Sequence, residues 1–128
     1  MNRHQIRRNV IQILYNVNLN GVSLEQAESL VEEGCSEAVE IARKVLNDIQ
    51  KIDEVISNNI ENYELSRLNV VDRSIVEYAT YELLNDITPK EIIISEALKL
   101  TEEFSDEGNK NQVKFNNKLL DKIASLRG

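Results

Sequence analysis

Basic side chains are concentrated at the start of this 128-residue chain, where they could bind anions. The first 24 residues contain Arg3, Arg7, Arg8 and His4 but no Asp or Glu. The remaining residues hold 12 of the 15 Lys and Arg and all 22 acidic groups. Their formal charge is therefore −10, and the net charge of the whole chain is −7. Arginines spaced along one segment could contact nucleic-acid phosphates. The pattern also fits a basic helix docked on the acidic body of the same protein.

Catalysis and metal binding need groups of residues that this sequence lacks. His4 and Cys35 are the only His and Cys. They are too few for a zinc site, and they could form a nucleophile pair only if the fold brought them together. No glycine-rich phosphate loop is present. The sequence therefore predicts no enzyme, no metal site and no cofactor.

The same residue inventory predicts where the protein works. With a single cysteine, Cys35, the chain cannot form an internal disulfide, which suggests a reducing compartment. No apolar run approaches the roughly 20 residues that cross a membrane, and the N-terminus does not resemble a signal peptide. We expect a soluble cytoplasmic protein.

The basic residues sit on a helix predicted over residues 2–18. Its buried stripe consists of apolar residues at helical spacing: Ile6, Val10, Ile13, Leu14 and Val17. His4, Arg8, Ile11 and Tyr15 line the opposite side of the helical wheel. Ile11 and Tyr15 therefore either pack on another part of the chain or mark a partner site, and the spacing leaves both interpretations open.

Two helices are predicted to follow. A capping box of Ser23 and Gln26 opens the first, and Gly34 ends it. Residues 36–62 are expected to form one long helix. Its apolar seam alternates by four and three residues: Val45, Ile49, Ile52, Ile56 and Ile60. This spacing predicts packing against nearly parallel or antiparallel helices.

The most apolar helix is predicted at the centre of the chain, over residues 67–84. Its stripe contains Leu68, Val71, Ile75, Ala79 and Leu83, with further apolar residues on one flank. A helix that is apolar on most sides is typically wrapped by its neighbours. We therefore expect the other helices to pack around it.

Two more helices are predicted toward the C-terminus, separated by a polar loop over residues 105–112. Thr88 is expected to cap the first, with Pro89 as its first residue and Glu91 completing a capping box. The first helix is expected to bury Ile93, Ala97, Leu100 and Phe104. The second is expected to align Phe115, Leu119, Ile123 and Leu126.

Helical periodicity with one Pro and four Gly favours an all-α fold. We predict a compact bundle of about six to seven helices in two packed halves of three to four helices each. The whole chain, residues 1–128, would be a single domain. Its N-terminal half would cover about residues 1–62 and its C-terminal half about residues 63–128.

Four segments of the sequence resemble the NusB family of transcription antitermination factors. The N-terminal segment contributes Arg7, Gln12, Leu14 and Tyr15. The central segment contributes Leu65–Leu68, Asp72, Arg73, Ile75, Ala79 and Tyr81–Leu84. The third contributes Asp86, Ile87, Pro89, Ile94, Glu96, Ala97 and Leu100, and the last Lys114, Phe115, Asn117 and Leu120–Ile123. Their order and spacing extend over essentially the whole chain.

The resemblance implies a non-enzymatic, all-helical RNA-binding protein. Family members bind single-stranded boxA RNA together with a small ribosomal subunit protein. The pair joins an antitermination complex on RNA polymerase that supports ribosomal RNA transcription. Some relatives self-associate, so a homodimer is among the expected states.

The resemblance also implies roles for individual residues. Positions expected near RNA are Arg3, Arg7, Arg8, Tyr63, Lys114 and Phe115. Tyr15 and Asp72 correspond to positions that touch the ribosomal protein, and Ile11 shares the face of Tyr15 on the helical wheel. The residues themselves leave alternatives open. Phe115 could be a core aromatic, Lys114 a solvated helix end, and Asp72 a first-turn charge that favours its helix.

The chain departs from the family pattern at two charged positions. Lys118 stands where a small residue is usual, and Glu77 replaces a frequent Arg. With about three phosphates contacted, RNA binding by this chain alone is expected to be weak, with a log–log salt slope of about −2. Two alternatives follow: a helical protein-interaction adaptor with little RNA affinity, or a detached accessory domain of an RNA-modifying enzyme.

Overall fold

A computed structural model describes residues 2–29, 35–61, 64–85, 88–105, 108 and 110–127. These residues form seven α-helices, two short 3-10 helices and no strand, as the periodicity predicted. The α-helices are α1 (Arg3–Asn20), α2 (Leu24–Glu28), α3 (Ser36–Asn47), α4 (Ile49–Asn59), α5 (Val70–Asn85), α6 (Lys90–Phe104) and α7 (Asn111–Ala124). The 3-10 helices are η1 (Leu65–Arg67) and η2 (Ser125–Arg127). No described helix is long and apolar enough to cross a membrane.

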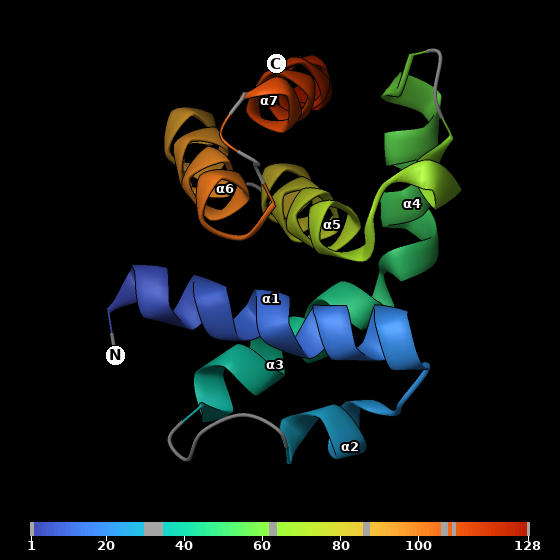
Figure 1. Cartoon of the computed structure of the whole chain (residues 1–128), viewed down its shortest axis with the longest axis vertical. Coiled ribbons are helices and arrows are strands. Elements are labelled where there is room, and N and C mark those ends of the chain that lie inside the picture. Colours follow the sequence, from blue (N-terminus) through green and yellow to red (C-terminus); the bar gives the residue numbers. More distant parts are fainter. Residues whose placement is uncertain are drawn as a thin grey trace.

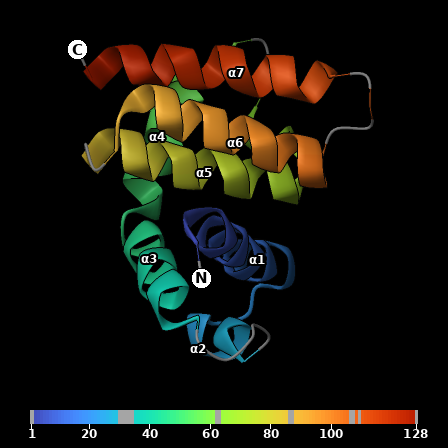
Figure 2. The same ribbon diagram turned by 90° about the vertical axis from the view of Figure 1, so that its left-hand side faces the viewer.

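Helix α5 lies at the centre and packs against α1, α4, α6 and α7 (Figure 1). Figure 2 shows α5, α6 and α7 running side by side, with α1 crossing beneath them, α3 beside α1, and α2 below α1. Every residue from Ser74 to Leu83 is buried. The prediction of a central helix wrapped by its neighbours is confirmed. It begins at Val70, because the Asn69 side chain accepts a hydrogen bond from the Asp72 amide at 2.8 Å.

The single helix predicted over residues 36–62 is wrong, because the chain breaks at Asp48 into α3 and α4. Helix α3 packs against α1, whereas α4 packs against α5 and α7. The predicted apolar seam is therefore divided between two helices with different neighbours. Val45 is buried in α3, and Ile52 and Ile56 are buried in α4. The predicted boundary between halves assigns α4 to the N-terminal half, yet its contacts lie with the C-terminal helices.

Of the two capping boxes predicted from the sequence, one is present in the structure and the other is not. Ser23 and Gln26 form the expected capping box, with hydrogen bonds of 3.0 and 3.1 Å. Helix α2 ends at Glu28, with Ser29 as its C-cap, so the predicted end of this helix at Gly34 is wrong. Gly34 itself lies outside the described residues. Pro89, rather than Thr88, is the N-cap of α6, because its carbonyl accepts from the amides of the first helical turn. The start of α6 has no side-chain capping hydrogen bond, so the predicted Thr88–Glu91 capping box is wrong.

Two apolar side chains expected in the core lie at the surface. Phe104 is 42% exposed and Leu126 is 61% exposed. Phe104 is the last residue of α6, and Leu126 lies in η2 near the end of the chain. The interior members of the same stripes, including Leu100, Leu119 and Ile123, are buried as predicted.

Candidate functional site

The first turn of α1 is fixed by a capping box that sequence reasoning missed. The Gln5 amide donates to Asn2 Oδ1 at 2.9 Å, and the Asn2 amide donates to Gln5 Oε1 at 3.0 Å. The signal was an Asn three residues before a Gln, a known variant of the capping pattern. This turn holds Arg3 and His4 beside α3 and α6.

Arg3 and Arg8 are exposed and paired with acidic groups of this chain. Arg3 Nη1 lies 3.0 Å from Glu37 of α3. Arg8 Nε lies 3.1 Å from Glu103 of α6, and its guanidinium lies 5.3 Å from the centre of the Phe104 ring. Exposed ion pairs contribute only about 0–1 kcal/mol. An incoming phosphate could therefore compete for both arginines.

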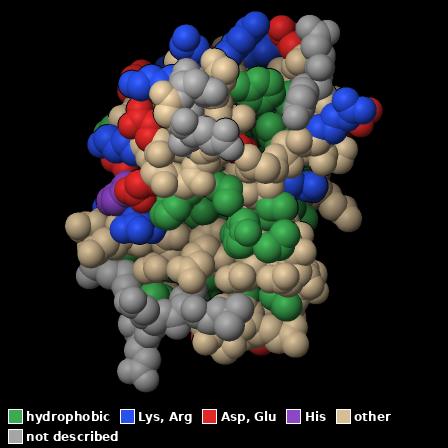
Figure 3. All heavy atoms as spheres, in the orientation of Figure 1, with side chains coloured by type: hydrophobic (Ala, Val, Ile, Leu, Met, Phe, Trp, Pro, Cys, Tyr) green, Lys and Arg blue, Asp and Glu red, His purple; other side chains and the backbone are tan. Residues whose placement is uncertain are grey.

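His4 bridges two carboxylates of α6. Its Nδ1 lies 3.2 Å from Glu96, and its Nε2 lies 3.0 Å from Glu103. The hydrogen bond to Glu103, followed by that to Glu96, raises the pKa of His4 above 6.5. In Figure 3 the single His side chain is flanked by acidic and basic groups. The start of α1 is therefore a mixed-charge surface and not a uniformly positive arm.

Arg7 is inside the protein, which corrects its predicted place on an RNA-facing arm. It is 4% exposed and donates two hydrogen bonds to the Glu82 carboxylate of α5, at 3.2 and 3.0 Å. Its guanidinium lies 5.9 Å from the Tyr78 ring centre. Burial raises the pKa of Glu82, and Arg7 opposes that shift. Arg7 therefore joins α1 to α5 and presents no charge to solvent.

One of the four residues on the predicted exposed face of α1 is buried. Ile11 is 4% exposed, so its expected place on a partner surface is wrong, and the alternative of packing on this chain holds. Helices α5, α3 and α2 all pack on α1, so an apolar residue outside the predicted stripe is buried as well. Tyr15 remains partly exposed.

Asp72 is also buried, with 0% of its surface exposed. It accepts hydrogen bonds from Ser105 Oγ at 2.6 Å and from Asn116 Nδ2 at 3.2 Å. Asn116 also donates to the Thr101 hydroxyl at 3.0 Å. Asp72 therefore connects α5 with α6 and α7, and its predicted direct contact with a protein partner does not fit its position.

A second buried charged cluster involves Glu77, which the sequence marked only as a departure from the family pattern. Glu77 Oε2 lies 3.2 Å from Arg73 Nε, and Arg73 Nη2 lies 3.1 Å from Asp53 of α4. Asn18 of α1 donates to Glu77 Oε1 at 3.0 Å. Burial, and then hydrogen bonding with Asp53, raises the pKa of Glu77 to about 8. This cluster joins three helices.

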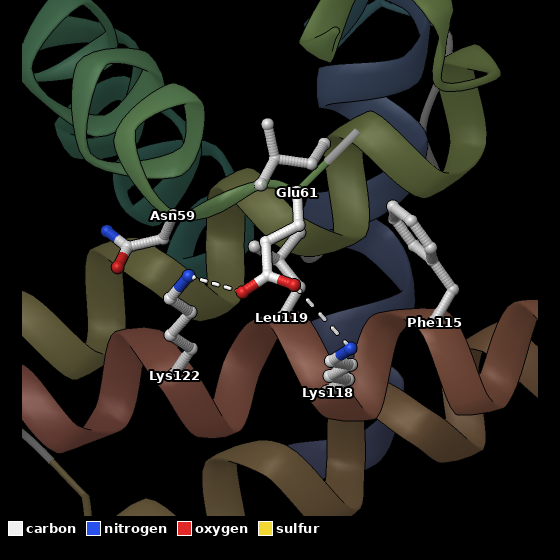
Figure 4. A pocket seen from close by; sticks show the side chains of 7 residues that line it. Asn59, Glu61, Phe115, Lys118, Leu119 and Lys122 are labelled. Carbon is white, nitrogen blue, oxygen red and sulfur yellow. Dashed lines mark hydrogen bonds and ion pairs between the residues drawn. The ribbon is translucent and has the colours of Figure 1, made fainter. Parts of the chain in front are cut away.

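An open pocket lies between the end of α4 and the surface of α7. Its volume is about 160 Å³, and it is lined by Asn59, Ile60, Glu61, Phe115, Lys118, Leu119 and Lys122 (Figure 4). Phe115 is partly exposed there, and the neighbouring Lys114 is exposed. Phe115 therefore contributes both to the core and to the surface. Tyr63, also expected near RNA, lies outside the described residues.

The candidate residues form two separate groups. Arg3, His4 and Arg8 face carboxylates of α3 and α6, whereas Phe115, Lys118 and Lys122 face the end of α4. In Figure 1 the N-terminus and α4 lie on opposite sides of the view. Within the described ranges, no group of three or more His, Cys, Asp or Glu is arranged to hold a metal ion.

Comparison with known proteins identifies relatives over nearly the whole chain. Residues 4–125 match the model of the NusB family. The chain is 30% identical over 127 residues to the transcription antitermination protein NusB of Campylobacter concisus, covering 94% of this chain and 95% of that protein. It is 31% identical over 128 residues to the protein of that name from Listeria innocua, covering 97% of each.

Solved structures show the same helical arrangement. The structure of T. maritima NusB superposes with a TM-score of 0.86 at 32% identity, covering 98% of this chain and 92% of that one. A chain in the crystal structure of a plectonemic RNA supercoil superposes with a TM-score of 0.81 at 19% identity, which shows a shared fold only.

Proposed function

The chain belongs to the NusB family and is a transcription antitermination factor, and on that premise we propose that it binds boxA-type single-stranded RNA together with a small ribosomal subunit protein. The pair would join an antitermination complex on RNA polymerase and support ribosomal RNA transcription. Proteins of this family are non-enzymatic, so the activity proposed here is binding.

The observation that carries the RNA proposal is the α4–α7 pocket. Single-stranded RNA is held by cations that follow its phosphates and by aromatic rings that stack on unpaired bases. Phe115 offers a partly exposed ring at the pocket, and Lys114 lies next to it in the chain and is exposed. The two residues provide both kinds of contact on one helix.

Arg3 and Arg8 form a second, weaker element of the proposed RNA site. Their acidic partners are exposed, so phosphates could replace those carboxylates at little cost. We assign Arg7 a structural role, because its charge is already neutralised inside the protein by Glu82. Because the net charge is −7, the chain would need the ribosomal protein to add RNA contacts.

The proposed protein-partner contact is Tyr15, which remains partly exposed on α1. A ring with a hydroxyl suits the centre of a protein interface, because it adds apolar area at low entropic cost. Ile11 and Asp72 are buried and would not touch the partner directly. They would contribute by holding α1 and α5 in place.

A second candidate function is a protein-interaction adaptor with the same fold and little RNA affinity. It is favoured by a specific observation: Arg3, His4, Arg7 and Arg8 all pair with carboxylates of this chain. Each such pair reduces the positive field available to RNA.

A titration separates the two functions. A boxA-like RNA is titrated with the protein at low salt, with and without the ribosomal protein, alongside a Tyr15→Ala variant. The RNA-binding function predicts weak binding alone, tighter binding with the partner, and loss of that gain in Tyr15→Ala. The adaptor function predicts partner binding with no RNA binding in either condition.

A further inference from the structure

Glu61 lies between two lysines at the mouth of the α4–α7 pocket. Its Oε1 is 2.8 Å from Lys122 Nζ, and its Oε2 is 3.6 Å from Lys118 Nζ. Figure 4 shows the carboxylate between the two ammonium groups, with the Phe115 ring nearby. All three charged side chains are exposed. One carboxylate of this chain therefore neutralises two cations that face solvent.

Local structure explains this placement. Lys118 and Lys122 are four residues apart on α7, so they share one face of the helix. Ile60 ends α4 in an extended conformation, with φ −81° and ψ 130°, and the next residue is Glu61. The hydrogen bond from Lys122 lowers the pKa of Glu61, so this carboxylate stays ionised at neutral pH.

The same pair of ammonium groups suits a phosphate. Lysine binds phosphate as a compact charge with three donors, and two lysines on one helix face could hold one phosphate or two neighbouring ones. The ring of Phe115 lines the same pocket, so a base next to that phosphate would meet an aromatic surface. Because the ion pairs to Glu61 are exposed, displacing the carboxylate would cost little.

We propose that Lys118 and Lys122 form a phosphate-binding pair for single-stranded RNA and that Glu61 competes with the RNA for it. This inference rests on the proposed RNA-binding function.

Removing the competitor tests the inference directly. Glu61→Gln keeps the size of the side chain and removes its charge, so RNA affinity should rise about threefold. Lys118→Ala combined with Lys122→Ala should weaken binding, and the log–log salt slope should become less negative by about 1.4, the value for two phosphate contacts. Binding is measured with a boxA-like RNA and the ribosomal protein at several salt concentrations.

Matched variants control for net charge. Glu40→Gln makes the same charge change as Glu61→Gln, because Glu40 is exposed and pairs with Arg43 on α3 at 3.6 Å. Lys44→Ala combined with Lys99→Ala removes two exposed lysines from α3 and α6. Neither control should change RNA affinity, or its salt dependence, as much as the variant that it is matched to. Thermal unfolding of every variant checks that the fold is intact.

The outcomes distinguish this inference from the proposed function. Tighter binding by Glu61→Gln but not by Glu40→Gln, with a flatter salt dependence in the double-lysine variant, supports the phosphate pair. RNA binding that is unchanged both in Glu61→Gln and in the double-lysine variant overturns the pair and leaves the proposed function standing. Absence of RNA binding by both the wild type and Glu61→Gln overturns the two together.

Discussion

The guanidinium of Arg7 and the carboxylate of Glu82 form a bidentate ion pair inside the protein, with N–O distances of 3.2 and 3.0 Å. Arg7 comes from α1 and Glu82 from α5, so this contact joins the N-terminal helix to the central one. Arg7 is therefore part of the core, whereas Arg3 and Arg8 of the same basic segment remain exposed.

Truncating Arg7 should destabilise the protein without changing the salt dependence of RNA binding. Arg7→Ala leaves Glu82 buried and unpaired, which typically costs about 3–5 kcal/mol. Arg3→Ala is the matched control, since its exposed pair should cost about 0–1 kcal/mol. Urea unfolding gives both values. A stable Arg7→Ala protein with a flatter RNA salt slope would mean that Arg7 contacts phosphate.

Asp72 should matter for stability and not for direct contact with the ribosomal protein. Asp72→Ala leaves the buried Asn116 amide without one of its acceptors, at a cost of about 1–3 kcal/mol in unfolding free energy. Asp121→Ala, at an exposed position of α7, should be nearly neutral. Partner affinity is then measured well below the melting temperature. Loss of partner binding by a fully folded Asp72→Ala protein would contradict this expectation.

Glu77 should make the protein less stable as pH rises. Its folded-state pKa is about 8, above the usual value near 4.5. Because the folded state retains this proton when the unfolded state has lost it, the stabilisation is complete below pH 4.5 and disappears as pH rises through 8. Glu77→Gln should reduce this decline, measured as unfolding free energy from pH 5 to 9. Identical profiles for the two proteins would show that Glu77 does not titrate there.

His4 should also contribute stability that is lost as pH rises. Its folded pKa lies above 6.5 because of Glu103 and Glu96. The contribution is therefore fully present below pH 6.5 and disappears as pH rises through the higher, folded value. His4→Gln should remove this dependence while leaving the Glu77 profile unchanged. The measurement is the difference in unfolding free energy between variant and wild type at each pH.

Phe115 should affect RNA affinity through its ring more than stability through its volume. Phe115→Leu retains an apolar side chain and removes the stacking surface, so RNA binding should weaken by about 1–3 kcal/mol. Phe115→Tyr keeps the ring and should bind like the wild type. Both variants are compared by RNA titration and thermal unfolding. Equal RNA affinity for the two would place Phe115 in the core alone.

The sequence alone determined which segments are helical and much of which face each helix buries. The stripe through Ile75 and Leu83 and the Ser23–Gln26 box depend on neighbours three and four residues away, and the structure agrees with both. Such contacts lie within one helix, so periodicity is sufficient to find them. The four NusB-like segments likewise depended only on residue order and spacing.

Only the tertiary structure determined that Arg7, Ile11 and Asp72 are buried. A helical wheel gives the direction in which a side chain points, but it does not say how many neighbours cover that helix. Helices α5, α3 and α2 pack on α1, and Ser105 and Asn116 of the α6 and α7 region hydrogen-bond to Asp72. Burial of charged and apolar groups outside the predicted stripes therefore depended on contacts between distant segments, which no local pattern encodes.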